Sequence, residues 1–129
     1  MILAIDPGRE KCGLAILTEK GEVILKEIAA RREIAYRVMD LTNNYQFPTL
    51  VVGKSAFGKE VEKDLMRLDI KANIIFISEK YSTLEARSLY WQDHRPKGFW
   101  RLIPTSWRVP PAPIDDYAAV VLGKRYFKS

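Results

Sequence analysis

Acidic residues lie at three points where a folded chain can bring carboxylates together. Asp6 follows an unbroken apolar run at residues 2–5, Glu79 follows another at 74–77, and Asp115-Asp116 opens the last helical segment. A carboxylate at the rim of a buried strand is unfavourable unless something compensates its charge, and a bound divalent cation is one common compensation. These acidic residues are therefore candidate ligands of a divalent cation.

Each acidic position also has a purely structural explanation. The Asp-Pro-Gly sequence at residues 6–8 is an ordinary turn, because Asp accepts backbone hydrogen bonds while Pro and Gly supply the dihedral angles. Asp115 and Asp116 suit a helix N-terminus, where the dipole favours negative side chains. Glu79 taken alone is an exposed residue before a turn. The metal hypothesis therefore depends on one fold gathering all three positions.

Apolar runs predict five strands. Gly8 and Gly13 flank a charged tip between the first two runs, which indicates a β-hairpin, and a Glu19-Lys20-Gly21 turn leads into the third. The expected strands are residues 2–5, 14–17, 23–28, 49–52 and 74–77. The first three form an antiparallel meander.

Helical spacing separates the later strands. A helix begins after residue 31, a second precedes the fifth strand, a third runs from 82 to about 91, and a fourth from 114 to about 127. Ser82 and Glu85 have the spacing of a capping box for the third helix. Residues 93–113, rich in Pro, Trp and basic residues, have no period and predict a loop. The expected inward-facing residues are Ile34, Val38, Leu41, Tyr45, Val61, Leu65, Leu68, Ala118, Val121 and Leu122.

This order of elements predicts an α/β fold with a five-stranded mixed sheet in the order 3-2-1-4-5 and helices on both faces. Right-handed crossovers place the first, fourth and fifth strands side by side and parallel. Their carboxyl ends share one rim, which is where open α/β sheets bind ligands. Asp6, Glu79 and Asp115 meet at that rim.

Composition sets the broad class. The chain has 129 residues, 47% of them hydrophobic, which suits one domain over 1–129 with one core. Its 21 Lys and Arg against 16 Asp and Glu give a net charge of +5, which is compatible with a polyanionic partner. The single cysteine, Cys12, makes no internal disulfide and is expected to be a buried filler rather than a nucleophile. Neither a signal peptide nor a membrane-spanning stretch is visible, so a cytoplasmic location is expected.

The first hairpin resembles a known family. The pattern Asp-x-Gly-x-x-x-x-Gly-Leu-Ala is similar to the opening hairpin of the ribonuclease H-like superfamily, particularly its YqgF (RuvX) branch of Holliday-junction-resolvase-like proteins. The residues that match are Asp6, Gly8, Gly13, Leu14 and Ala15, whereas Glu10 and Cys12 depart from the pattern. The resemblance implies a ribonuclease H-like fold.

Two later segments extend the resemblance. Residues 78–86 resemble the family's Asp-Glu-Arg-Leu-Thr-Thr-x-Glu-Ala, with the glutamate kept as Glu79, and residues 114–119 resemble Ile-Asp-x-x-Ala-Ala, which selects Asp115. RuvC-type resolvases instead carry an acid after the fourth strand, where this chain has Gly53-Lys54. The resemblance implies catalytic Asp6, Glu79 and Asp115, and a Mg²⁺ site, with Mn²⁺ as a substitute, formed by these three with Asp116.

The implied reaction is two-metal hydrolysis of a phosphodiester, which needs no side-chain nucleophile. Two substrates follow from the resemblance: four-way DNA junctions and the 5′ end of precursor 16S ribosomal RNA. Symmetric junction cleavage requires two active sites and hence a homodimer, whereas RNA trimming suits a monomer. Candidate contacts to nucleic-acid phosphates are Arg9, Lys11, Lys54, Lys80, Arg87, Arg101 and Arg108, each of which alone is an ordinary surface charge.

Three other functions are compatible with parts of the sequence. A non-catalytic module of the same fold would bind nucleic acid or a protein partner without cutting. An actin-like ATPase shares a related hairpin but needs two such domains. Residues 53–59 imitate the spacing of a phosphate-binding loop, but Glu60 stands where that loop has the Ser or Thr that holds Mg²⁺.

Overall fold

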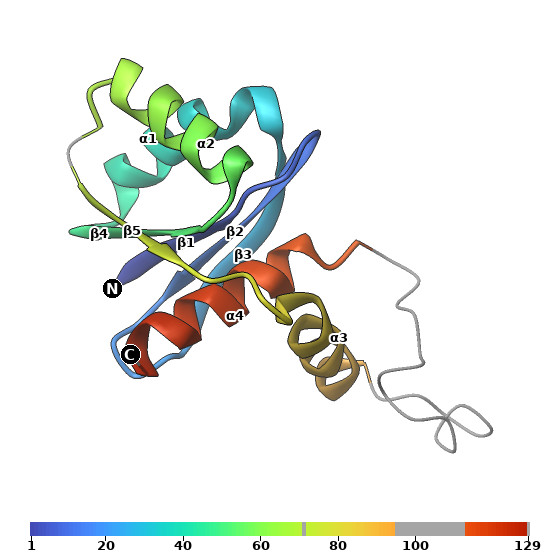
Figure 1. Ribbon diagram of the computed structural model, residues 1–129. Coiled ribbons are helices and arrows are strands. Elements are labelled where there is room, and N and C mark those ends of the chain that lie inside the picture. Colours follow the sequence, from blue (N-terminus) through green and yellow to red (C-terminus); the bar gives the residue numbers. More distant parts are fainter. Residues whose placement is uncertain (71, 95–112, 129) are drawn as a thin grey trace.

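The computed structural model describes residues 1–70, 72–94 and 113–128. Its strands are β1 (Ile2–Asp6), β2 (Lys11–Leu17), β3 (Val23–Ala30), β4 (Thr49–Gly53) and β5 (Asn73–Ile77). Within the described residues they form one sheet in the order β3-β2-β1-β4-β5, which confirms the predicted order (Figure 1). β1, β2 and β3 are an antiparallel meander, and β4 and β5 continue the sheet in parallel with β1.

Helices cover both faces of this sheet, as expected (Figure 1). They are α1 (Ile34–Asn44), preceded by the short 3-10 turn η1 (Arg31–Glu33), then α2 (Ala56–Arg67), α3 (Ser82–Asp93) and α4 (Asp115–Lys128). Val38 of α1 and Val61 of α2 belong to the core on one face, whereas Ala119 and Leu122 of α4 belong to the core on the other. α3 packs on the outer side of α4, where Ala86 and Tyr90 join Tyr117, Ala118 and Val121.

Successive residues of the central strands point to opposite faces, and both faces are buried. In β1, Leu3 and Ile5 pack with α1 and α2, whereas Ile2 and Ala4 pack with α4. This explains why the strand is an unbroken apolar run. Because side chains alternate, Asp6 follows Ile2 and Ala4 onto the α4 face.

Two local expectations were wrong. β3 continues past residue 28, because β2 begins at Lys11 and pairs with Ala30, which extends the ladder. The capping box at the start of α3 does not form. Tyr81, with a left-handed φ of 64°, is the residue before the helix, so Ser82 lies inside the first turn without a side-chain cap. Glu85 instead pairs with an arginine of α4.

The segment that imitates a phosphate-binding loop is a helix start. The Ser55 hydroxyl accepts a hydrogen bond from the Gly58 amide at 3.1 Å, which caps α2. The expected loop at 93–113 lies mostly outside the described residues, as do Arg101 and Arg108. No helix in the described ranges is both long enough and apolar enough to span a membrane.

Candidate active site

Asp6 is the last residue of β1 and occupies the rim between β2 and β4. Asp6 pairs with Gly13 of β2. The neighbouring strand on the other side is β4, which ends at Gly53, one residue after its last pair with β1. Gly13 lies in register with Ala15 and Leu17, and Gly53 with Val51, all of which pack on α4. Both glycines therefore lie beside Asp6 on the same face of the sheet.

Gly13 allows the start of α4 to approach Asp6 from the β2 side. A Cβ atom at this position would overlap the carbonyl oxygen of Asp115 and would lie 2.9 Å from the Asp116 amide nitrogen. Any side chain on residue 13 would thus displace the first turn of α4. The glycine that matched the family pattern is a packing requirement for placing Asp115.

Gly53 does the same for Glu79 from the β4 side. A Cβ atom on Gly53 would lie 2.5 Å from both Cδ and Oε1 of Glu79, so the glutamate side chain occupies the space that this glycine leaves open. The Lys54 amide donates a hydrogen bond to the Ile77 carbonyl at 2.8 Å, which holds the ends of β4 and β5 together just before the glutamate. Glu79 therefore reaches across β4 toward Asp6.

The three predicted catalytic acids interact electrostatically. Burial, a hydrogen bond with Glu79, and the nearby charges of Glu79 and Asp115 raise the pKa of Asp6 to about 8. Burial disfavours an isolated charge, and like charges disfavour simultaneous ionisation. At neutral pH the Asp6 carboxyl thus holds a proton and donates it in a hydrogen bond to Glu79.

Asp116 contacts residues other than the three predicted catalytic acids. Its Oδ2 lies 3.4 Å from Lys26 Nζ of β3, and its Oδ1 accepts a hydrogen bond from the Tyr117 amide at 3.0 Å. Asp115, by contrast, lies 3.5 Å from Lys11 Nζ. In the described ranges, no group of three or more Asp, Glu, His or Cys side chains is arranged so that it could hold a metal ion.

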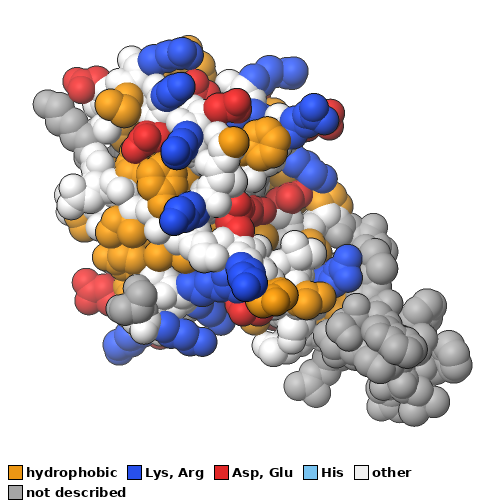
Figure 2. Space-filling view, in the orientation of Figure 1, with side chains coloured by type: hydrophobic (Ala, Val, Ile, Leu, Met, Phe, Trp, Pro, Cys, Tyr) orange, Lys and Arg blue, Asp and Glu red, His pale blue; other side chains and the backbone are white. Residues whose placement is uncertain are grey.

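Basic side chains surround the acidic rim. Figure 2 shows Asp and Glu side chains near the middle of the molecular surface in view, with Lys and Arg side chains around them. Of the predicted phosphate contacts, Arg9, Lys11, Lys54 and Lys80 are exposed. Arg87 is half-buried on α3, and its buried Nε has no hydrogen-bond partner among the described residues.

The comparisons with known proteins agree with this architecture. The chain matches no family model. It is 32% identical over 93 residues to a Helicobacter pylori (strain Shi470) protein named "Putative pre-16S rRNA nuclease", covering 67% of this chain and 69% of that protein. The Thermus thermophilus RuvC structure superposes with a TM-score of 0.56 at 11% identity, over 98% of this chain and 92% of that one, which shows the ribonuclease H-like fold. Through its Helicobacter relative, the chain belongs to the YqgF/RuvX family.

Proposed function

We propose that this chain is a metal-dependent nuclease that hydrolyses phosphodiester bonds in structured nucleic acid, acting as one domain over residues 1–129. The observation that carries the proposal is Asp6 at the rim of the sheet, with Glu79 and Asp115 brought close to it from opposite sides across two glycines. A half-buried carboxyl group beside two others is unfavourable when ionised unless a cation joins them. Such carboxyl groups are suited to binding a metal ion that assists catalysis.

The chemistry of the donors suits a hard divalent cation such as Mg²⁺ or Mn²⁺, because all three side chains offer carboxylate oxygens, which these ions prefer. The three side chains do not form a metal site as they stand, so binding requires them to turn toward a common point. Asp6, Glu79 and Asp115 would then hold the cation, while Asp116 is directed to Lys26 and the helix backbone. A cation bound there supplies activation of water and charge stabilisation at the scissile phosphate.

The remaining residues bind and orient the substrate. Lys54 directly follows β4 and Lys80 directly follows Glu79 after β5, and both would contact phosphates near the scissile bond. Arg87 is half-buried on α3 and would contact a phosphate only through the exposed part of its guanidinium group. Cys12 is fully buried, and burial raises the pKa of its thiol, so it is unsuited to act as a nucleophile.

We propose the 5′ region of precursor 16S rRNA as the substrate and the cytoplasm as the compartment. The name of the Helicobacter relative supports the RNA, and the free Cys12 suits a reducing environment. A monomer suffices for this reaction, whereas symmetric cleavage of a four-way DNA junction would require a dimer. A monomeric active species in sedimentation would therefore exclude the junction assignment.

The decisive experiment compares cleavage of a labelled precursor-rRNA 5′ fragment and a labelled four-way DNA junction. Each is incubated with Mg²⁺ or EDTA and with wild type or Glu79→Gln, which keeps the shape of the side chain but removes its charge. We expect Mg²⁺-dependent cutting of the RNA by wild type and loss of on the order of a thousand-fold in the variant.

Glu19→Gln is the matched control, because Glu19 is an exposed carboxylate in the turn after β2, at the opposite end of that strand from Gly13. It should cut like wild type. Binding of both substrates without any cutting would refute the nuclease proposal and favour a non-catalytic binding module. Cutting of the junction alone would overturn the RNA assignment.

Gly53→Ala should lower kcat by about 100-fold while it changes the melting temperature little. The three atoms nearest to the added methyl group all belong to the Glu79 side chain, which can turn away without moving the backbone. A thermal melt and steady-state kinetics on the same preparation separate the two effects. Wild-type kcat in a folded Gly53→Ala protein would contradict the position assigned to Glu79.

A further inference from the structure

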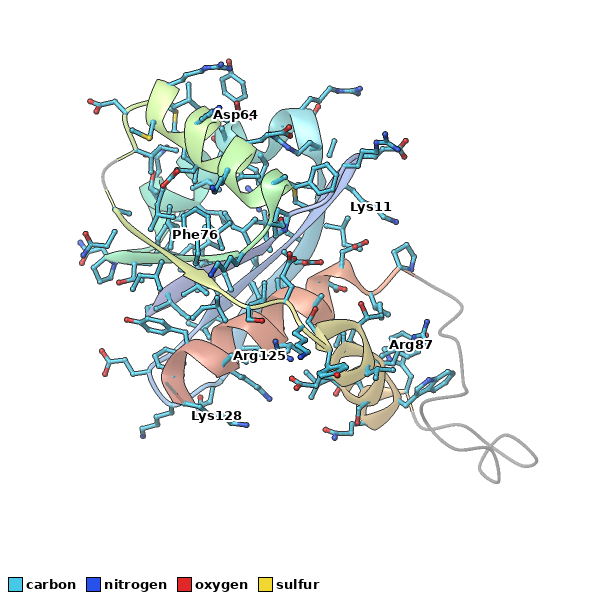
Figure 3. All side chains as sticks on the ribbon, in the orientation of Figure 1. Lys11, Asp64, Phe76, Arg87, Arg125 and Lys128 are labelled. Carbon is cyan, nitrogen blue, oxygen red and sulfur yellow. The ribbon has the colours of Figure 1, made fainter. Side chains whose placement is uncertain are left out.

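Arg125 of α4 ties down the loop that carries Glu79. Its Nη1 donates to the Ser78 carbonyl at 2.6 Å and its Nη2 to the Lys80 carbonyl at 2.7 Å. The same Nη2 lies 2.9 Å from Oε1 of Glu85 in the first turn of α3. Figure 3 shows Arg125 lying between α4 and the start of α3. One side chain thus contacts the backbone immediately before and after Glu79.

The loop needs such support because it leaves the sheet at an edge. β5 pairs only with β4 in the described sheet, and Ser78 and Lys80 are exposed. The chain then turns sharply, with the Ser82 amide donating to the Glu79 carbonyl at 2.9 Å and Tyr81 in the left-handed region. A short exposed loop of this kind has few buried contacts to hold one conformation.

The geometry suits arginine in particular. A planar guanidinium offers several donors in a fixed arrangement, so it can bind two carbonyls and a carboxylate together, whereas an ammonium group is a single point charge. Glu85 provides the matching negative charge, with its side chain 53% exposed and that of Arg125 21% exposed. The contact is therefore partly shielded from water and well directed.

We propose that Arg125 is a positioning residue for Glu79, an inference that rests on the proposed nuclease function. By fixing the carbonyls on both sides, Arg125 sets the position of the Glu79 backbone and hence the direction from which its carboxylate reaches Asp6. Asp115 and Arg125 belong to the same helix. α4 therefore places one acid directly and a second through Arg125, so both keep a constant relation to Asp6.

The test uses Arg125→Met, which keeps the length of the side chain but removes its donors, together with Arg125→Lys. Lys128→Met is the matched control, because Lys128 is an exposed cation in the same last turn of α4. Three quantities are measured on the full chain: hydrogen exchange of the Ser82 amide, Mn²⁺ affinity by titration calorimetry, and kcat and KM for cleavage.

In Arg125→Met we expect faster Ser82 exchange, about 10- to 100-fold weaker Mn²⁺ binding, and a similar fall in kcat with KM for the nucleic acid nearly unchanged. Arg125→Lys should recover part of each loss, and Lys128→Met should behave like wild type.

A folded Arg125→Met protein with wild-type Ser82 exchange and Mn²⁺ affinity would overturn the inference, whatever the activity. Equal losses in Lys128→Met would also overturn it, since they would reflect charge rather than position. The proposed function fails separately, if wild type binds Mn²⁺ in a Glu79-dependent way but cuts neither substrate. In that case exchange and Mn²⁺ affinity still decide the role of Arg125.

Discussion

Asp6→Asn should abolish cleavage and, with EDTA present, should stabilise the folded protein at pH 8. The two effects share one cause. The Asp6 carboxyl is half-buried beside Glu79 and Asp115, so it is a good cation ligand and an unfavourable place for a free negative charge. Asparagine keeps the shape but carries no charge, which removes both properties. We expect cleavage to fall by on the order of a thousand-fold while nucleic-acid binding is retained.

The sign of the pH dependence follows from the raised pKa. The carboxyl of Asp6 has a pKa of about 8 in the folded protein against an ordinary value of 3.8, so between these values the folded state holds a proton that the unfolded state releases. Stability falls as pH rises wherever the folded state binds more protons. The contribution of Asp6 to stability is therefore full below about pH 4 and is lost as the pH rises through 8.

Melting temperatures of wild type and Asp6→Asn, measured in EDTA from pH 5 to pH 9, test this. The variant should gain on wild type as the pH rises, by about 4 kcal/mol in free energy of unfolding between pH 5 and pH 8. Added Mg²⁺ should then raise the melting temperature of wild type but not of the variant.

Asp40→Asn controls for the loss of any carboxylate, because Asp40 is exposed on α1, which covers the other face of the sheet. It should show neither effect. Parallel pH curves for wild type and Asp6→Asn would mean that Asp6 is not buried beside the other two acids.

Gly13→Ala should be the most destabilising single-methyl change in this site. The new Cβ meets the backbone of Asp115 and Asp116 rather than a flexible side chain, so the first turn of α4 must move. Overpacking of this kind costs about 3 kcal/mol when the backbone cannot yield. Urea unfolding followed by circular dichroism should show that loss, and cleavage should disappear with the displaced Asp115.

Gly21→Ala provides the comparison. Gly21 has a φ of 83° and open space around it, so alanine there is strained only through its backbone, which costs about 1 kcal/mol. That variant should remain active. A Gly13→Ala protein as stable as wild type would show that α4 does not begin against β2 at this point.

Much of the fold was predictable because its signals are local. Continuous apolar runs marked β1 and β4, helical spacing marked α1 and α2, and the alternation of strand and helix led to the sheet order. The capping box failed because Tyr81, not Ser82, is the residue before α3, and the Ser82 amide donates to the Glu79 carbonyl. Glu85 is paired with Arg125, which lies 40 positions later in the chain. A local pattern cannot reveal a partner from a distant element.

The acids were predictable only in part. Strand ends and the family resemblance indicated Asp6, Glu79 and Asp115, but no sequence pattern indicated that Gly53 makes room for the Glu79 side chain. Its role depends on which face of β4 it occupies, and a strand buried on both faces has no polar alternation to show this. The different roles assigned to Asp115 and Asp116 depend on Lys26, which the folded sheet brings into contact with Asp116.

Helix α4 has a consequence for the timing of activity during synthesis. It is the last described element in the chain, yet it covers one face of β1 and β2 and provides Asp115. A nascent chain that has emerged from the ribosome only as far as α3 lacks both that cover and the third acid. Domains fold as their final elements leave the exit tunnel. Under the proposed function, the chain therefore gains nuclease activity only after α4 has emerged.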